Sequence, residues 1–212
     1  MKNFNLILTI LVFSFHILIA ASSDPVFGEN GMIVSTSKQA SEAGIEILKK
    51  GGNAVDAAVA VGFALAVTSS SNGNIGGGGF MVAAMTDGET FTLDYREKAP
   101  AAAHRDLFLN DSGNVVPGMS LFSRAGSGVP GTVDGLIRAL ADHGSGNITL
   151  RQALAPAIRL AEKGFELSHY EARRFNGYEG LFQSNDAAAA IFIRKDNNPW
   201  KKGDKLVQRD LA

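Results

Sequence analysis

Residues 73–100 read GNIGGGGFMVAAMTDGETFTLDYREKAP, and this stretch decides the fold. Four consecutive glycines, Gly76–Gly79, lead into an apolar run, Phe80–Met85, and a second run, Phe91–Tyr95, ends in a charged cluster. Glycine has no side chain to pack and loses the most backbone freedom on folding, so four in a row are costly. Such a run is expected where two backbones pass closely or where a ligand touches the main chain.

The two apolar runs are separated by Thr86–Glu89, which contains an Asp-Gly pair. An Asp-Gly pair between apolar runs is the strongest short signal for a β-hairpin. We therefore predict a hairpin with strands over Phe80–Met85 and Phe91–Tyr95. Because side chains alternate along a strand, one face of the second strand should carry Phe91, Leu93 and Tyr95, and the other Thr92, Asp94 and Arg96.

The glycine run does not fit a nucleotide-binding loop. A P-loop requires Gly-Lys-Ser/Thr at the start of a helix, whereas Gly79 is followed by Phe80 and a predicted strand. The dinucleotide fingerprint needs a strand, then the loop, then a helix, and the order here is helix, loop, strand. Two interpretations remain open: a loop packed tightly under other backbone, and a loop beside a substrate site.

Helix starts are marked by capping residues at three places. Ser37, Asn53 and Thr149 each precede a helical pattern, and Asp56 falls in the first turn after Asn53, where the helix dipole favours a negative charge. The second of these helices is apolar nearly all round and should be buried. Pro156 falls inside the third and is expected to kink it.

The whole order of elements mixes helices with strands and a hairpin, which favours an α+β fold over a doubly wound sheet. We predict helices over Lys38–Lys50, Ala54–Val67, Thr132–Asp142 and from Thr149 to about Lys163, a polar helical stretch to Phe175, strands over Gly31–Ser35 and Ile191–Arg194, and the start of another helix after Asp204.

The composition excludes several classes of function. The 212 residues are 45% hydrophobic and 19% charged, with a net charge of −1, so the chain has no electrostatic footprint for nucleic acid. Cysteine is absent, which excludes thiolate zinc sites and a cysteine nucleophile. The four histidines are scattered without the spacing of a metal site, so we predict no metal and no cofactor.

The first residues have the pattern of a secretory signal peptide. A short positive start is followed by an almost wholly apolar stretch, Phe4–Ile19, and by the small residues Ala20–Ser23. We predict a signal peptide over residues 1–22, one domain over residues 23–212, and a secreted or periplasmic protein. Sequons begin at Asn110 and Asn147, and they matter only in a host that glycosylates exported proteins.

Arg96 is the candidate binding residue. It lies at the end of the second predicted strand, on the polar face, and its planar guanidinium can bind a carboxylate through two hydrogen bonds. The alternative is an ion pair with Asp94 or Glu97 that serves only the structure. No Gly-x-Ser-x-Gly elbow is present, and no side chain is a persuasive nucleophile by itself.

Several long motifs resemble the γ-glutamyltransferases, also called glutathione hydrolases. The residues that carry the resemblance occur in the family's order and extend over nearly all of the chain after the signal. They are GGNAVDAAVA (51–60), GNIGGGGFM (73–81), DYREKAP (94–100), GVPGTV (128–133) and KGDKLVQ (202–208).

The resemblance implies the αββα fold of the N-terminal-nucleophile hydrolases, in which helices sandwich two stacked sheets. It implies a precursor that cuts itself into a large and a small subunit, whose new N-terminal threonine attacks the γ-glutamyl amide of glutathione and related compounds. A free amine beside a threonine hydroxyl can act as its base. By the same resemblance, Arg96 binds the α-carboxylate of the γ-glutamyl group.

The resemblance covers only the N-terminal part of the large subunit, and the threonine nucleophile is expected beyond Ala212. We therefore expect a partial fold, completed by later parts of the precursor, that neither processes itself nor hydrolyses a γ-glutamyl anilide. Truncation should leave unpaired strand edges and exposed apolar surface. Two other functions remain open: a non-catalytic module that binds γ-glutamyl compounds through Arg96, and a related acylase of the same superfamily.

Overall fold

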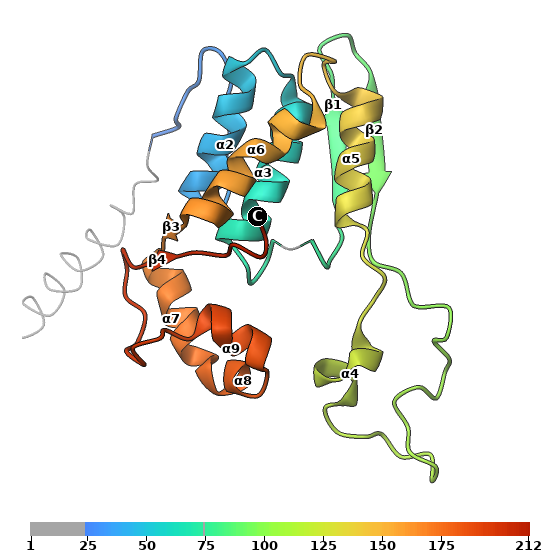
Figure 1. Cartoon of the computed structure of the whole chain (residues 1–212). Helices are drawn as coiled ribbons and strands as arrows, with labels where there is room; N and C mark the ends of the chain where they lie inside the picture. Colours follow the sequence, from blue (N-terminus) through green and yellow to red (C-terminus); the bar gives the residue numbers. More distant parts are fainter. Residues whose placement is uncertain (1–23, 74) are drawn as a thin grey trace, which may run out of the picture. The chain divides into compact units, whose positions relative to one another are not determined.

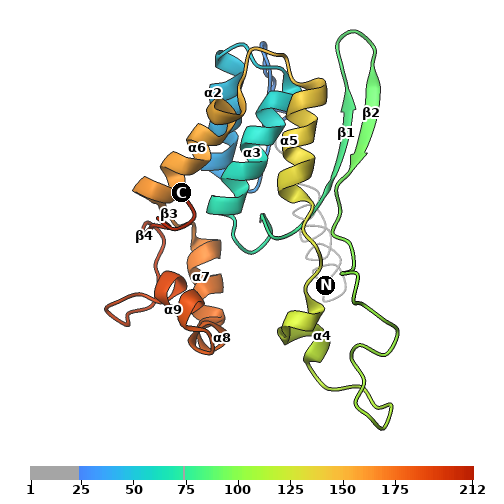
Figure 2. The ribbon, with the colours of Figure 1, turned by 45° about the vertical axis from the view of Figure 1, so that its right-hand side comes forward.

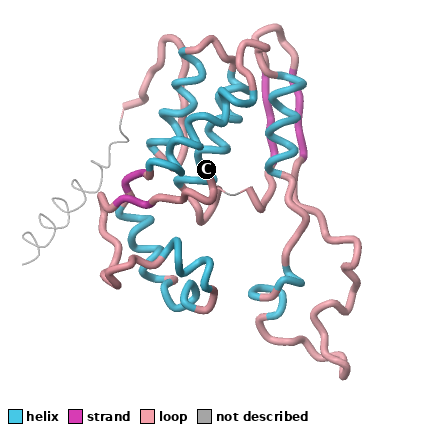
Figure 3. Tube along the Cα trace, in the orientation of Figure 1, coloured by secondary structure: helices cyan, strands magenta, loops and turns pink. Residues whose placement is uncertain are grey.

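The computed structural model describes residues 24–73 and 75–212, so the predicted signal peptide lies outside the described residues. The chain divides into two units, residues 1–32 and residues 33–212. The described part of the first unit, residues 24–32, contains no helix or strand. All the described helices and strands belong to the second unit (Figure 1 and, coloured by type, Figure 3).

Helices α2 (Lys38–Lys49) and α3 (Ala54–Thr68) begin at the predicted caps. The Ser37 hydroxyl accepts a hydrogen bond from the Ala40 amide. At the start of α3, the Asn53 side chain accepts from the amides of Val55 and Asp56, and the Asp56 carboxylate accepts from the Asn53 amide at 2.8 Å. This reciprocal capping satisfies amides that have no partner within the helix.

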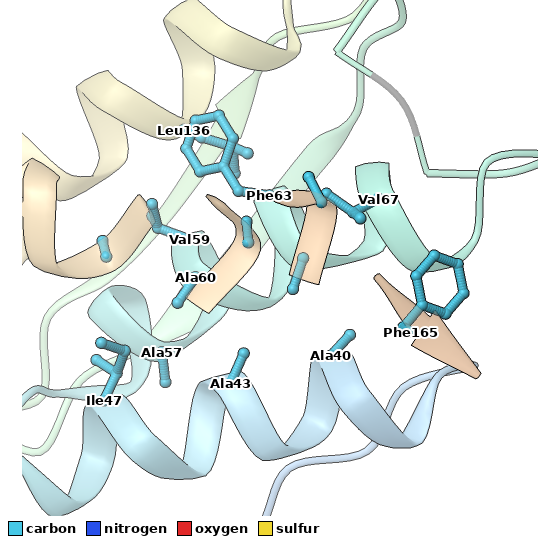
Figure 4. Close-up of a cluster of buried hydrophobic side chains, with 14 of the residues drawn as sticks. Ala40, Ala43, Ile47, Ala57, Val59, Ala60, Phe63, Val67, Leu136 and Phe165 are labelled. Atoms are coloured by element: carbon cyan, nitrogen blue, oxygen red, sulfur yellow. The ribbon is translucent and has the colours of Figure 1, made fainter. Parts of the chain in front are cut away.

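Helix α3 is the centre of the core. It contacts α2 on one side and α5 (Thr132–His143) and α6 (Leu150–Lys163) on others, which explains why it is apolar nearly all round. Alanines at the α2–α3 contact let the two helices approach closely, and Phe63 packs beside Leu136 of α5 (Figure 4). The buried side chains drawn there include Ala40, Ala43, Ile47, Ala57, Val59, Ala60, Phe63, Val67, Leu136 and Phe165.

The predicted hairpin is confirmed. Strands β1 (Phe80–Ala84) and β2 (Thr90–Asp94) are antiparallel, with Phe80 opposite Asp94 and Ala84 opposite Thr90. Gly88 in the connecting turn has a φ of 93°, which an L-residue rarely adopts. Helix α5 contacts β2 and α3, and in Figure 2 it lies between α3 and the hairpin.

The two faces of the hairpin differ as the alternation predicts. Met81, Phe91 and Leu93 pack against the core, whereas Phe80 and Val82 are 61% and 81% exposed. Thus one face of the hairpin is covered by the helices, and apolar side chains on the other are open to solvent.

Helix α6 is capped by Thr149, whose hydroxyl accepts from the Gln152 amide, and it continues through Pro156 to Lys163. It leads into β3 (Phe165–Glu166), which pairs antiparallel with β4 (Lys205–Leu206). The helix predicted to begin after Asp204 is therefore wrong. Those residues pair with a strand about forty positions earlier, and local periodicity carries no sign of such a partner.

Three short helices follow β3: α7 (His169–Gly177), α8 (Glu179–Gln183) and α9 (Asp186–Phe192). The strand predicted over Ile191–Arg194 is also wrong, because Ile191 and Phe192 end α9. Asn185 caps this helix by accepting from the Ala188 amide at 3.0 Å, and the alanines after it favour a helix.

The strand predicted over Gly31–Ser35 is absent as well. Residues 33–35, the part of this segment in the second unit, pair with no described strand. Their side chains still alternate: Ile33 packs against the helical core, and Val34 is 84% exposed. A strand needs a neighbouring backbone to satisfy its polar groups, and no described strand pairs with this segment.

The segment between α9 and β4 is stabilised by an ion-paired arginine. The Arg194 guanidinium pairs with Asp196 and Asp204 and lies over the Trp200 ring, 5.4 Å from its centroid. The hydrogen bond from Arg194 holds the pKa of Asp196 well below its usual range. Asp204 and the turn at Gly203 belong to the KGDKLVQ motif, so this motif is structural at least in part.

The fold is α+β and rich in helix, and its strands form two separate two-stranded sheets in the described part of the chain. The stacked sheets of an αββα sandwich stay a prediction. No helix in the described ranges is long and apolar enough to cross a membrane.

Candidate functional site

Arg96 lies two residues after the last residue of β2, in a segment that other backbone surrounds closely. Tyr95 continues the hairpin pairing, since its amide donates to the Gly79 carbonyl at 3.0 Å and its carbonyl accepts from the Gly79 amide at 3.3 Å. On the other side of Arg96, Lys98 and Val129 exchange two backbone hydrogen bonds, at 3.2 and 2.8 Å. The main chain of Arg96 is therefore fixed on both sides.

The glycine run packs directly on this segment. A Cβ atom built on Gly78 would lie 2.6 Å from both the Tyr95 carbonyl oxygen and the Glu97 amide nitrogen, and one on Gly79 would lie 2.8 Å from the Tyr95 ring. Real Cβ atoms do not approach other atoms so closely. Of the two interpretations of the glycines, close packing is thus what the structure shows, under other backbone at Gly78 and against the Tyr95 ring at Gly79.

A second pair of glycines, at the start of α5, packs on the same segment from the other direction. A Cβ on Gly131 would overlap the Tyr95 carbonyl, and one on Gly135 would overlap Cβ and Cγ of Tyr95. The amides of Gly131 and Thr132 both donate to the Gly77 carbonyl, at 2.8 and 3.0 Å. These bonds join the glycine run to the first turn of α5, and Tyr95 lies between the glycine run and this turn.

The far end of the hairpin is also attached to α5. The rings of Phe91 and His143 are stacked, with centroids 3.6 Å apart and planes 9° apart. His143 Nδ1 lies 3.4 Å from a carboxylate oxygen of Glu89. Helix α5 therefore contacts the hairpin near Arg96 at its first turn and near the β-turn at its last.

The Arg96 side chain points into solvent, with 69% of its area exposed. Its Nε atom lies 4.0 Å from an Oε atom of Glu97, whose side chain is 41% exposed. An ion pair at this distance between exposed groups contributes little to stability. The Asp94 carboxylate instead accepts from the Arg96 backbone amide at 3.0 Å. The predicted pair with Glu97 is thus present but weak, and Asp94 fixes the main chain.

Burial changes the acid–base behaviour of Tyr95. Packing against the glycines and α5 raises the pKa of its phenol above the ordinary value, because burial disfavours the charged phenolate. A tyrosine is already neutral at physiological pH at its ordinary pKa, and burial makes this phenol harder still to ionise, so the neutral ring acts as a packing group.

The described residues contain no group of three or more histidine, cysteine or acidic side chains that could hold a metal ion. The segment around Arg96 offers a cation on a fixed backbone, and this arrangement can bind an anion such as a carboxylate. It offers no nucleophile, and the sequence predicts none here.

The sequence points to Arg96 and to the glycine run but not to Tyr95, Gly131 or Gly135. The passage Gly126–Gly135 is rich in glycine, and that signal was present. What was missing was its partner, because nothing local shows that a segment more than thirty residues away packs on Tyr95.

Comparisons with known proteins agree with this reading of the motifs. A sequence model described as Gamma-glutamyltranspeptidase matches residues 40–212. The chain is 46% identical over 206 residues to the glutathione hydrolase proenzyme of Pseudomonas sp. (strain A14), covering 97% of this chain and 35% of the relative. It is 45% identical to the glutathione hydrolase proenzyme of Escherichia coli (strain K12), covering 89% of this chain and 32% of that relative.

Among solved structures, the gamma-glutamyltranspeptidase of Helicobacter pylori superposes with a TM-score of 0.83 at 41% identity, covering 89% of this chain and 53% of that one. The chain spans about a third of the length of the curated relatives it matches. The matched region contains the glycine run, the hairpin and the segment around Arg96, and the family model covers most of the sequence. The chain therefore belongs to the γ-glutamyltranspeptidase family.

Proposed function

We propose that this chain is part of a glutathione hydrolase, which cleaves the γ-glutamyl amide bond through a threonine acyl-enzyme and passes the γ-glutamyl group to water or an amino acid. The names of the relatives at 46% and 45% identity support this activity. The observation that carries it is Arg96, an exposed guanidinium on a main chain that is fixed on both sides. The threonine and most substrate contacts belong to the later portion of the precursor.

Arg96 binds the α-carboxylate of the γ-glutamyl group in this proposal. A carboxylate matches the planar fork of donors on a guanidinium, and the resulting hydrogen bonds are charge-assisted. The competing pair with Glu97 is long and exposed, so a substrate carboxylate can displace it at little cost.

The proposed partner is the small subunit cut from the same precursor, and the proposed complete fold is the αββα sandwich. Two features support it: the relatives' names describe proenzymes, and the hairpin exposes Phe80 and Val82 on its outer face. Exposed apolar side chains on a sheet face indicate a surface that another layer covers.

A hybrid proenzyme tests the role of Arg96. Residues 24–212 of this chain replace the segment that they match in the Pseudomonas sp. (strain A14) relative, and release of p-nitroaniline from γ-glutamyl-p-nitroanilide is measured. We expect an active hybrid in which Arg96→Ala raises KM by on the order of 10- to 100-fold, because a hydrogen bond to a charged group contributes about 1.5–3 kcal/mol. The purified 212-residue chain by itself should release no chromophore above background.

The matched control is 4-aminobutyryl-p-nitroanilide, which lacks only the α-carboxylate. Its KM should be high in the hybrid and unchanged by Arg96→Ala, since the arginine has no partner to lose. An Arg96→Ala variant that processes γ-glutamyl-p-nitroanilide with an unchanged KM would show that Arg96 does not bind the substrate.

Two other functions give different results. A non-catalytic γ-glutamyl-binding module would show saturable heat when the chain alone is titrated with glutamate or glutathione, and Arg96→Ala would abolish it. A related acylase would gain little from the α-amino group, so it would cleave a glutaryl anilide, which lacks only that group, as well as a γ-glutamyl one.

Secretion or transfer to the periplasm also belongs to the proposal, with residues 1–22 as the cleaved signal. The support is the sequence pattern alone: a positive start, an apolar stretch and small residues before Asp24. N-terminal sequencing of the mature protein should find a start at or next to Ser23, and an intact Met1 would contradict cleavage.

A further inference from the structure

We propose that Tyr95 is a positioning residue for substrate binding: its ring, held between the glycine run and α5, sets the place of the Arg96 guanidinium. This inference rests on the proposed function of Arg96. It assigns to Tyr95 and Gly135 a task that acts through Arg96 without any contact between these residues and the substrate.

The geometry around Tyr95 carries the inference. Its ring touches Gly79 on one side, where a Cβ would come within 2.8 Å, and Gly135 of α5 on another, where a Cβ would overlap the ring base. Any side chain larger than hydrogen at either position would push the ring away. The ring therefore occupies a slot that two glycines, 56 positions apart in the sequence, leave open for it.

The backbone of the same residue is fixed as firmly as its ring. The Tyr95 amide and carbonyl both pair with Gly79, and the next amide, that of Arg96, donates to the Asp94 carboxylate at 3.0 Å. Beyond Arg96, Lys98 pairs with Val129. Within Asp94–Lys98, the Arg96 side chain stays 69% exposed while its main chain has these bonds on both sides.

This arrangement lowers the cost of binding. A carboxylate that meets a mobile arginine must order it, and ordering a long side chain and its backbone opposes binding. With the main chain already ordered, only the side chain has freedom to lose. A shift of the guanidinium by a fraction of a hydrogen-bond length would also disturb the two parallel hydrogen bonds that it can form with a carboxylate.

The contacts with Gly79 and Gly135 are made mainly by ring carbons of Tyr95, so the ring is what fills the slot. Tyr95→Phe should therefore behave as the wild type, whereas Tyr95→Ala should not. Gly135→Ala tests the same slot from the helix, where alanine also favours the helical conformation of α5 itself. Gly177→Ala is the matched control, because a Cβ at this helical glycine meets nothing within 4 Å.

Two measurements decide the matter. In the 212-residue chain, hydrogen exchange of the amides over Asp94–Lys98 should be faster in Tyr95→Ala and Gly135→Ala, and unchanged in α2 and α3. In the hybrid proenzyme, the same two variants should raise KM for γ-glutamyl-p-nitroanilide on the order of tenfold, with kcat little changed. KM for 4-aminobutyryl-p-nitroanilide should not move, and Tyr95→Phe and Gly177→Ala should match the wild type in every assay.

Other outcomes overturn the inference. If Tyr95→Ala and Gly135→Ala leave KM unchanged while Arg96→Ala raises it, Arg96 binds the substrate but Tyr95 does not position it. If both variants raise KM equally for γ-glutamyl-p-nitroanilide and for 4-aminobutyryl-p-nitroanilide, Tyr95 serves the fold alone. An unchanged KM in Arg96→Ala itself would instead remove the proposed function of Arg96, and the positioning proposal with it. Far-UV circular dichroism identifies a variant that has failed to fold, and the other then supplies the result.

Discussion

Replacing Phe175 with alanine is expected to lower the free energy of unfolding by about 3–5 kcal/mol, which is typical of a buried phenylalanine. Phe175 is 6% exposed and lies at the centre of an aromatic cluster. Its ring centroid lies 6.4 Å from that of Phe182, 5.3 Å from that of Phe192 and 6.2 Å from that of Trp200. Edge-on and tilted pairs of this kind add about 0.5–1.5 kcal/mol beyond the area they bury.

The effect should be large because the cluster holds together α7, α8 and α9, and Phe175 contacts aromatic residues from each side. Urea unfolding followed by tryptophan fluorescence measures it, since Trp200 is the chain's one tryptophan and therefore reports on this cluster. Its indole N–H donates to the Phe192 carbonyl at 2.7 Å, so loosening of the cluster should also shift its emission to longer wavelength.

Phe122→Ala is the control for the loss of a phenylalanine as such. Phe122 is 73% exposed in α4 (Met119–Phe122), and a surface substitution usually changes stability by less than about 0.5 kcal/mol. Equal losses in Phe175→Ala and Phe122→Ala would contradict a dominant part for the aromatic cluster.

Replacing Asp56 with alanine is expected to cost about 3 kcal/mol or more. The carboxylate is fully buried, and one of its oxygens accepts from two backbone amides, that of Asn53 at 2.8 Å and that of Ser145 at 3.0 Å. Each hydrogen bond to a charged group contributes about 1.5–3 kcal/mol, and alanine would leave both amides without that acceptor. The second bond is long-range and holds the loop after α5 against the start of α3.

Asp56→Asn separates the hydrogen bonds from the charge. The other carboxylate oxygen, Oδ1, is buried without a hydrogen-bond partner among the described residues, so the NH₂ group of asparagine can take its place while the amide oxygen keeps both amides. We expect Asp56→Asn to lower the free energy of unfolding by much less than Asp56→Ala does. Thermal unfolding followed by circular dichroism gives the comparison.

Asp134→Ala is the matched control, since Asp134 also lies in the first turn of a helix but is exposed. It should change the free energy of unfolding by about 0.5 kcal/mol or less. A loss in Asp56→Ala no greater than in Asp134→Ala would mean that the link between Asp56 and Ser145 does not stabilise the fold.

The sequence predicted well those elements whose causes lie within a few residues. Ser37, Asn53 and Thr149 begin helices where their side chains cap the first turn, and Asp87–Gly88 turns the hairpin. Each of these signals acts over two to four positions, so the identity of the residue largely determines the conformation.

The failures share a different cause. Lys205–Leu206 is a strand only because Phe165–Glu166 lies beside it. Ile191–Phe192 is helical because Asn185 and the alanines that follow Asp186 start a helix that continues through these two residues. In the first case a distant partner decides, and in the second a neighbouring element overrides a short β-branched run.

The candidate site shows the same division. Arg96 could be found because its place at the end of an alternating strand and the family's motif both mark it. Tyr95 could not, since it looks like one more apolar residue of the predicted strand Phe91–Tyr95 until Gly79 and Gly135 are placed against its ring.

Both ends of helix α5 are attached to the glycine run and the hairpin, so the length of α5 must match the distance between these two attachments. Its first turn is joined to Gly77 beside Tyr95, and its last residue, His143, stacks on Phe91 near the β-turn. Twelve helical residues rise about 18 Å, and one residue more or less moves an end by about 1.5 Å and turns it by about 100°. Substitutions can be absorbed along this helix, but a single inserted or deleted codon would break one attachment in order to keep the other.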